Sequence, residues 1–180
     1  MNELYCPLNL PVTFFSDKFN IKKFKILNHQ RVTNENISKE YFDFLTYLNI
    51  KLNHVELFIT RPNLFLRIHK DQHNIHDFPK INFIIGGKYS TMNWYKPKSH
   101  TIGKIQHTTI ATPYIGYDLK DVDLIFSKEI HSPSIIQAGV PHNVTTPVLR
   151  YAFSTVYTSM NDKLLTWEEI LSIFKDYIIK

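Results

Sequence analysis

The sequence predicts a mainly β protein with one helix before and one helix after a series of short strands. Two observations support this class. Through the middle of the chain apolar residues recur at every second position, and turn residues arrive at short intervals. Toward each end the apolar spacing becomes that of a helix. The 180 residues, 43% of them apolar, can bury a sizeable core, and we expect one domain over residues 1–180.

The first predicted helix covers residues 37–50, where apolar residues recur at helical spacing. The second begins near Thr166 and runs to the C-terminus. Thr166 and Glu169 have the spacing of a capping box, in which a hydroxyl and a carboxylate accept hydrogen bonds from free N–H groups of the first turn. We expect the apolar stripe of each helix to pack in the core.

Eight strands are predicted between these helices, each bounded by glycine, proline or another turn residue. They cover residues 54–60, 64–71, 80–85, 92–95, 105–111, 123–126, 134–138 and 148–157. Short strands with short loops are typical of two-sheet barrels and sandwiches. The architecture that we expect is an antiparallel jelly roll of the cupin type, with its β core at about 54–158 and a helix on either side.

Composition and charge argue against several classes of protein. No run of 18 apolar residues is present, so we expect no membrane span. The first residues contain an acid, no basic cluster and two prolines, unlike a signal peptide. The single cysteine, Cys6, cannot form an internal disulfide and is expected to be a buried, inert thiol. Together with a start unlike a signal peptide, this favours a cytoplasmic protein. The net charge of +5 is spread along the chain, so nucleic-acid binding is not indicated.

A candidate metal site begins in the second predicted strand. Alternate residues of a strand share a face. One face is therefore expected to carry Leu64, Leu66 and Ile68, and the other Phe65, Arg67, His69 and Asp71. An imidazole and a carboxylate side by side supply two of the three ligands in a facial triad, which leaves open positions on an octahedral ion.

The third ligand must come from another of the nine histidines. His142 is the best placed, because Gly139 and Pro141 before it mark a turn into a strand. His107 and His131 are alternative third ligands, and His73 and His76 are alternatives to His69 in a differently built site.

Arg150 opens the last predicted strand, eight residues after His142. Its strand neighbours Ala152 and Ser154 are expected on the same face, and Tyr151 and Phe153 on the other. An arginine inside a small barrel is costly unless it is paired. A bound carboxylate is a natural partner, because the planar guanidinium meets it in two parallel hydrogen bonds.

This order of residues resembles the Fe(II)/2-oxoglutarate-dependent dioxygenases, a family built on a double-stranded β-helix. The matching residues are His69-Lys70-Asp71 as the His-x-Asp element, His142 as the distal histidine and Arg150 on the following strand. The resemblance implies that His69, Asp71 and His142 bind Fe(II), and that Arg150 holds the far carboxylate of the co-substrate 2-oxoglutarate. A serine two residues after the arginine is frequent in the family, whereas here Ser154 follows by four. The implied reaction is hydroxylation of a C–H bond in a small-molecule or peptide substrate.

Three further residues are expected near this site. Asn82 either hydrogen-bonds the 2-oxoglutarate chelate or is an ordinary strand-end amide. Trp94 is expected in the core rather than in the pocket wall. Arg67 is expected to pair with an acid at the barrel rim.

Two other interpretations stay open. A cupin-type metalloprotein that does not use 2-oxoglutarate usually relies on three histidines, which the Asp71 carboxylate argues against. In a jelly-roll binding or structural domain without enzymatic activity, His69, Asp71 and His142 would not converge.

Overall fold

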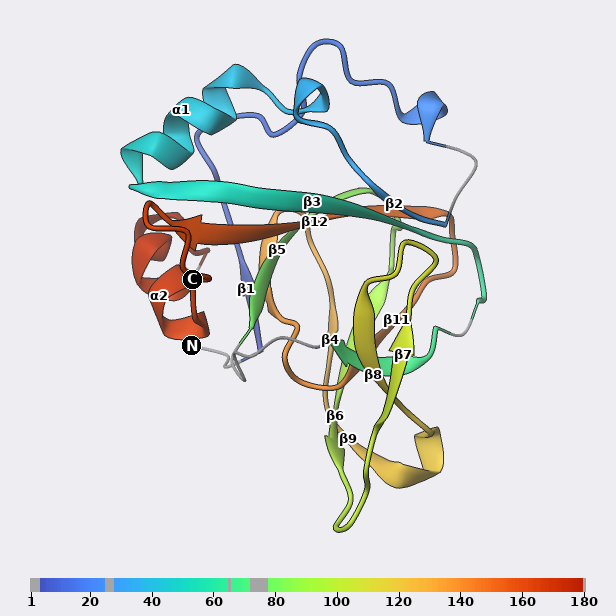
Figure 1. Cartoon of the computed structure of the whole chain (residues 1–180). Helices are drawn as coiled ribbons and strands as arrows, with labels where there is room; N and C mark the ends of the chain where they lie inside the picture. The colour runs from blue at the N-terminus through green and yellow to red at the C-terminus, as the bar shows by residue number, and fades with distance from the viewer. Residues whose placement is uncertain (1–3, 25–27, 65, 72–77, 180) are drawn as a thin grey trace.

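The computed structural model describes residues 4–24, 28–64, 66–71 and 78–179. Its strands form two antiparallel six-stranded sheets, which confirms the mainly β class and the two-sheet arrangement (Figure 1). The first sheet contains, in order, β1 (Tyr5–Pro7), β10 (Ser134–Gln137), β5 (Pro79–Gly86), β12 (Arg150–Ser159), β3 (Ile50–Thr60) and β2 (His29–Arg31). The second contains β7 (Lys104–His107), β8 (Pro113–Tyr117), β4 (Ile68–Asp71), β11 (His142–Thr145), β6 (Thr91–Pro97) and β9 (Val122–Glu129).

The chain passes repeatedly from one sheet to the other. From β3 onward, the strands β3, β5, β10 and β12 lie in the first sheet, and β4, β6, β9 and β11 lie in the second. The β7–β8 hairpin is inserted between β6 and β9 and extends the second sheet beyond β4. This path places residues that are distant in sequence on adjacent strands.

Several strand predictions need correction. The strands β1, β2 and β8 were not predicted, because runs of three to five residues carry too little alternation, and β11 was expected only as a strand that begins after the turn before His142. The strand β4 begins at Ile68 rather than at residue 64, because residues 62–63 form a turn and the described residues 64, 66 and 67 are irregular. Conversely, β3 begins at Ile50, directly after Asn49 adopts a left-handed conformation (φ 58°) and ends the preceding helix.

Both predicted helices are present, but both are shorter than predicted, and β1 and β2 precede the first of them. The helix α1 (Lys39–Tyr47) is capped by Ser38, whose hydroxyl accepts a hydrogen bond from the Tyr41 amide. The helix α2 (Trp167–Ile173) is followed by the 3-10 turn η4 (Lys175–Tyr177) instead of continuing to the C-terminus. The Thr166–Glu169 capping box is confirmed. Three other 3-10 turns are η1 (Ile21–Lys23), η2 (Asn34–Asn36) and η3 (Leu119–Asp121).

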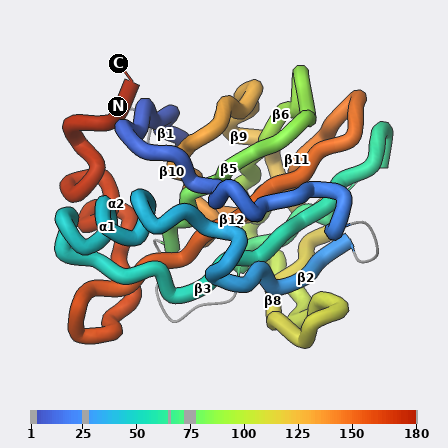
Figure 2. The backbone as a smooth tube through the Cα atoms, turned by 90° about the horizontal axis from the view of Figure 1, so that it is seen from above, coloured from blue at the N-terminus to red at the C-terminus, as the bar shows by residue number. Residues whose placement is uncertain are grey.

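The larger core lies on the outer face of the first sheet, under α1 and the N-terminal segment, with α2 at one end (Figure 2). There Phe14 stacks on Phe83 of β5, and Tyr41 of α1 packs edge-on against the same ring. Trp94 is fully buried in a second cluster between the sheets, as predicted. Cys6 is buried, as expected. No helix in the described part of the chain is long and apolar enough to cross a membrane.

The inner face of the first sheet is unusually polar. Strand alternation directs Val55, Leu57 and Phe153 to the outer core. Their neighbours therefore face the second sheet, and these include the buried polar residues Glu56, Lys80, Asn82 and Ser154. Because buried polar groups need partners, we expect a ligand-binding site on this inner face.

Candidate metal centre

Two histidines from distant parts of the sequence meet on adjacent strands. His69 of β4 and His142 of β11 are direct partners in the antiparallel register. Their ring centroids are 4.6 Å apart. His142 begins its strand, as the Gly and Pro before it predicted.

Hydrogen bonds fix the orientation of both rings. His69 Nδ1 donates to the carbonyl of Arg67 (3.0 Å), and His142 Nδ1 donates to the carbonyl of Val140 (2.8 Å). A ring whose Nδ1 carries the proton has its free lone pair on Nε2. Metal-binding histidines usually donate their second ring nitrogen in this way. The two rings therefore have the tautomer that a metal site requires.

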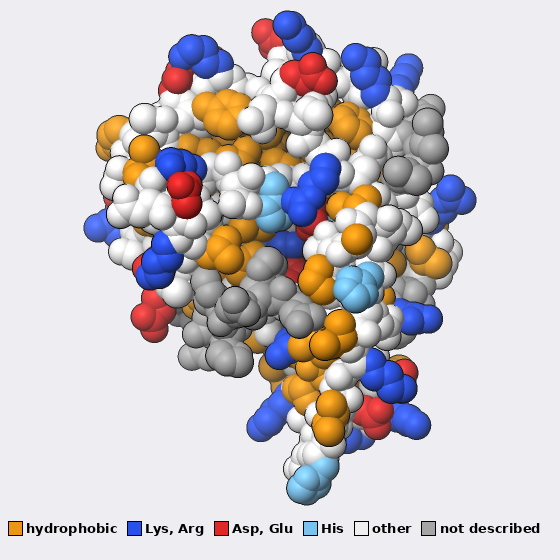
Figure 3. All heavy atoms as spheres, viewed as in Figure 1, with side chains coloured by type: hydrophobic (Ala, Val, Ile, Leu, Met, Phe, Trp, Pro, Cys, Tyr) orange, Lys and Arg blue, Asp and Glu red, His pale blue; other side chains and the backbone are white. Residues whose placement is uncertain are grey.

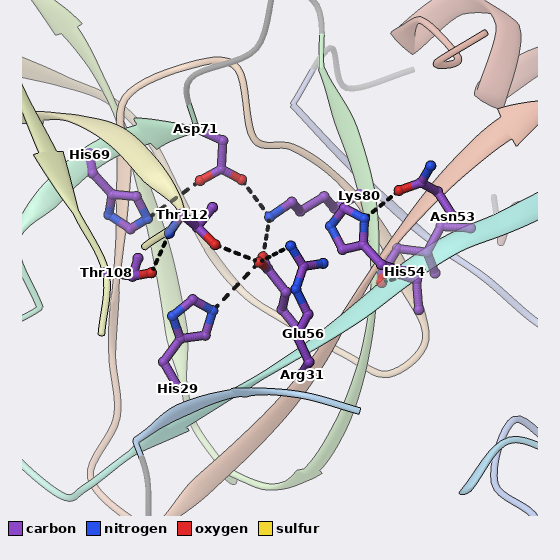
Figure 4. Close-up of polar contacts among 12 residues, drawn as sticks. His29, Arg31, Asn53, His54, Glu56, His69, Asp71, Lys80, Thr108 and Thr112 are labelled. Atoms are coloured by element: carbon purple, nitrogen blue, oxygen red, sulfur yellow. Dashed lines mark hydrogen bonds and ion pairs between the residues drawn. The ribbon is translucent and has the colours of Figure 1, made fainter. Parts of the chain in front are cut away.

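Asp71 lies beside this pair, at the end of β4. Its Oδ1 is 3.9 Å from His69 Nε2, and its Oδ2 is 2.7 Å from the Nζ of Lys80 (Figure 4). Adjacent ligand atoms about 2 Å from one octahedral ion are about 3 Å apart. The carboxylate must therefore turn slightly to share an ion with His69. Consistently, no group of three His, Cys, Asp or Glu side chains among the described residues has ready-made metal-site geometry.

The protonation states suit a cation. Burial acts to raise the pKa of Asp71, but Lys80 and the two imidazoles hold it at about 2, so the carboxylate is ionised at neutral pH. Burial lowers the pKa of His142 to about 3, so this ring is neutral. One carboxylate and a neutral imidazole lone pair therefore face the same space.

A small cavity between the sheets joins these residues to Arg150. It is lined by His69, Asp71 and His142 together with Arg150, Asn82 and Ser154. As predicted, Arg150, Ala152 and Ser154 share the face that lines it, whereas Tyr151 and Phe153 pack on the outer core. The structure thus brings all six predicted site residues to one cavity.

Arg150 is buried with unmet hydrogen-bonding capacity. It is 2% exposed, and its Nε and Nη2 atoms have no hydrogen-bond partner among the described residues. Burial lowers its pKa to about 10, so the guanidinium stays charged at neutral pH. Asn82 is the cross-strand partner of Ser154, and its Oδ1 also has no hydrogen-bond partner among the described residues. Such groups are costly in a folded protein unless a ligand satisfies them.

Some expectations about neighbouring residues were wrong or fall outside the described chain. Arg67 does not pair with an acid in the described structure, but donates to Oε1 of Gln106 (2.9 Å). Leu66 lines the cavity together with His69 and Asp71 instead of pointing away, because regular alternation starts only at Ile68. Phe65, His73 and His76 lie outside the described residues.

Two charged residues at the site were not predicted. Lys80 Nζ lies between Asp71 and Glu56, 3.4 Å from Oε2 of Glu56. Burial acts to raise the pKa of Glu56, but His29, Lys80 and Arg31 hold it well below its usual range. The available signal was the alternation of Lys80 and Asn82 with Ile81 and Phe83, which puts a lysine on the polar inner face.

A second, larger cleft of about 380 Å³ opens next to the metal residues. His69 and Asp71 line it, along with His29, Phe58 and Tyr114. His29 stacks on Phe58, and Tyr114 meets the His69 ring edge-on. Figure 3 shows acidic, basic and histidine side chains gathered around the hollow near the middle of this face. His107, an alternative third ligand, borders this cleft but not the inner cavity.

A scan against models of known protein families finds none that matches this chain. A search of curated proteins finds no significant match either.

Proposed function

We propose that this protein is a non-haem Fe(II)- and 2-oxoglutarate-dependent oxygenase that hydroxylates a C–H bond of a small-molecule or peptide substrate. The observation that carries the proposal is the joint lining of one cavity by His69, Asp71, His142 and an unsatisfied, buried Arg150. A metal triad alone fits many proteins. A triad facing a buried guanidinium fits a metal with an anionic chelating ligand.

The path of the chain supports the same proposal. From β3 to β12, leaving aside the β7–β8 hairpin, four strands lie in each sheet and the chain changes sheet at every step except from β6 to β9, as expected for a double-stranded β-helix of the jelly-roll type. Of these eight strands, the second, β4, ends at Asp71, and the seventh, β11, begins at His142.

The residues present suit both groups. His69 Nε2, His142 Nε2 and Asp71 Oδ1 would hold the ion, since nitrogen and carboxylate oxygen together suit Fe(II). Arg150 would bind the far carboxylate of 2-oxoglutarate through Nε and Nη2, and Asn82 or Ser154 would hydrogen-bond its other polar atoms. When bound, iron and 2-oxoglutarate supply the oxygen activation that hydroxylates an unreactive carbon.

The protein itself contributes positioning and exclusion of water. Leu66, Met92 and Val144 form an apolar wall of the cavity. Asp71 and His69 also border the outer cleft, so a substrate in that cleft would lie next to the ion. A volume of about 380 Å³ is within the range of small-ligand sites, which span about 300 to 1,000 Å³.

The test is anaerobic addition of Fe(II) and then 2-oxoglutarate to the purified protein. We expect a visible metal-to-ligand charge-transfer band that needs both additions. Asp71→Ala should abolish it, whereas the control Asp162→Ala, which removes an exposed carboxylate paired with Lys51, should not. Metal uptake without a band at saturating 2-oxoglutarate would instead indicate a metalloprotein that does not use this co-substrate.

A further inference from the structure

Lys80 is a buried cation that reaches from the first sheet to the candidate metal centre (Figure 4). It is 4% exposed, and its Nζ lies 2.7 Å from Asp71 Oδ2 and 3.4 Å from Glu56 Oε2. The ammonium also lies near the rings of Phe58 and Phe78. Because an ammonium is costly to bury without partners, these two carboxylates account for its place.

The contact divides the two oxygens of Asp71 between different partners. Oδ1 faces His69 Nε2, whereas Oδ2 is held by Lys80. A carboxylate that uses both oxygens fills two coordination positions of an ion, but a carboxylate that uses one fills only one. Three single-atom protein ligands leave three positions open on an octahedral ion. A chelating co-substrate needs two of these and oxygen needs one.

Glu56 prevents Lys80 from moving with Asp71. Its Oε1 accepts a hydrogen bond from Thr112 (3.1 Å) and lies 3.5 Å from an Arg31 nitrogen and 3.7 Å from His29 Nε2. Glu56 is itself 1% exposed and fixed on β3. The ammonium therefore lies between two carboxylates, one on each of two strands.

The geometry points to Lys80 as a positioning residue that keeps Asp71 a one-oxygen metal ligand, with Glu56 as its anchor. This inference rests on the proposed function, because it concerns the number of positions left for 2-oxoglutarate and oxygen. Lys80 itself does not bind the ion, since an ammonium has no free lone pair.

The test compares Glu56→Gln with the double variant Glu56→Gln/Lys80→Met. Lys80→Met alone would remove the ammonium from between two buried carboxylates and endanger folding. The double variant avoids this, because loss of one acid and one base leaves the net charge unchanged. Lys51→Met, at an exposed ion pair with Asp162, is the matched control for a lysine-to-methionine change. Thermal unfolding verifies that each variant folds.

Two readouts are independent of activity: the visible absorption spectrum of the Co(II) form, which reports coordination number, and calorimetric binding of 2-oxoglutarate to that form. We expect Lys51→Met to keep the wild-type spectrum. Glu56→Gln should keep it too, because the glutamine amide oxygen can still accept a hydrogen bond from the Lys80 ammonium. The double variant should show a changed spectrum and about tenfold weaker 2-oxoglutarate binding, a size typical for residues that support metal ligands. Its Co(II) affinity should not fall, because removing an ammonium near a dication removes repulsion.

The outcomes separate the two proposals. The same spectrum and 2-oxoglutarate affinity in Glu56→Gln and the double variant would overturn the role of Lys80 while leaving the proposed function intact. If the double variant loses metal affinity, co-substrate affinity and thermal stability together, the ion pair is merely structural, and this result would also overturn the role of Lys80. If the wild-type protein binds neither Co(II) nor 2-oxoglutarate, both proposals fall.

Discussion

His69 and His142 are direct neighbours across an antiparallel strand pair, although most of the β core separates them in sequence. Both rings donate Nδ1–H to a backbone carbonyl two residues before them in the chain. This repeated hydrogen bond presents two Nε2 lone pairs to one space. This arrangement supports the proposed metal centre.

Removal of either histidine should abolish metal binding. We expect His69→Ala and His142→Ala to weaken Mn(II) or Co(II) binding by more than about a hundredfold, because losses of supporting residues alone reach that range. Metal titration followed by calorimetry measures it. His131→Ala is the control, since this exposed residue was an alternative ligand from sequence. If His142→Ala keeps the metal and His131→Ala loses it, the third ligand is His131 and not His142.

Replacement of Arg150 should separate stability from co-substrate binding. Arg150→Met removes a buried charge whose Nε and Nη2 have no hydrogen-bond partner in the part of the chain that is described, so the ligand-free protein should gain about 1 kcal/mol in free energy of unfolding. Excess 2-oxoglutarate with metal should raise the thermal midpoint of the wild type but not of the variant. Equal stabilisation of both proteins by 2-oxoglutarate would contradict the role of Arg150.

Gly87 gives Arg150 the room that it needs. Gly87 has φ +65°, and an added Cβ would lie 2.7 Å from Arg150 Cγ. Gly87→Ala should therefore cost about 1 to 2 kcal/mol and weaken 2-oxoglutarate binding, as measured by urea unfolding and calorimetry. The control is Thr166→Ala, which removes a helix cap far from the site at a similar cost of about 1 kcal/mol. Equal 2-oxoglutarate affinity in Gly87→Ala and Thr166→Ala would show that Gly87 does not support co-substrate binding by Arg150.

Acid should destabilise the metal-free protein through His142. Below the ordinary histidine pKa of 6.5 the unfolded chain binds a proton that the folded protein excludes until about pH 3. Stability is therefore present above pH 6.5 and is lost as the pH falls, by about 1.4 kcal/mol per unit for this group. Asp71, whose folded pKa is about 2, adds a loss in the same direction at lower pH.

The measurement is urea unfolding of metal-free protein at pH 7 and pH 5. His142→Gln should lose about 2 kcal/mol less than the wild type over this interval, because glutamine does not titrate. An identical pH dependence in the two proteins would show that His142 does not carry the effect.

Local features of the fold were predictable. The capping box of α2, the turn before His142 and the shared face of Arg150, Ala152 and Ser154 depend on neighbouring residues, and all are present. The alternation predicted for 64–71 was wrong for Leu66, because a turn precedes that stretch and its described residues before Ile68 have irregular backbone. Three-residue strands such as β2 left no periodic signal, although β2 brings His29 and Arg31 to Glu56.

The order of His69, Asp71, His142 and Arg150 along the chain, and the alternation that turns each of them inward, were determined by the sequence alone. Only the tertiary structure decided that a lysine and a glutamate from two other strands meet at the same point. Strand alternation states which face a side chain takes, but not which strand lies opposite. The opposing strand is decided by how the chain crosses between the two sheets. This crossing brings Lys80 to Asp71 and Glu56, because a buried charge is stable only beside a charge of opposite sign.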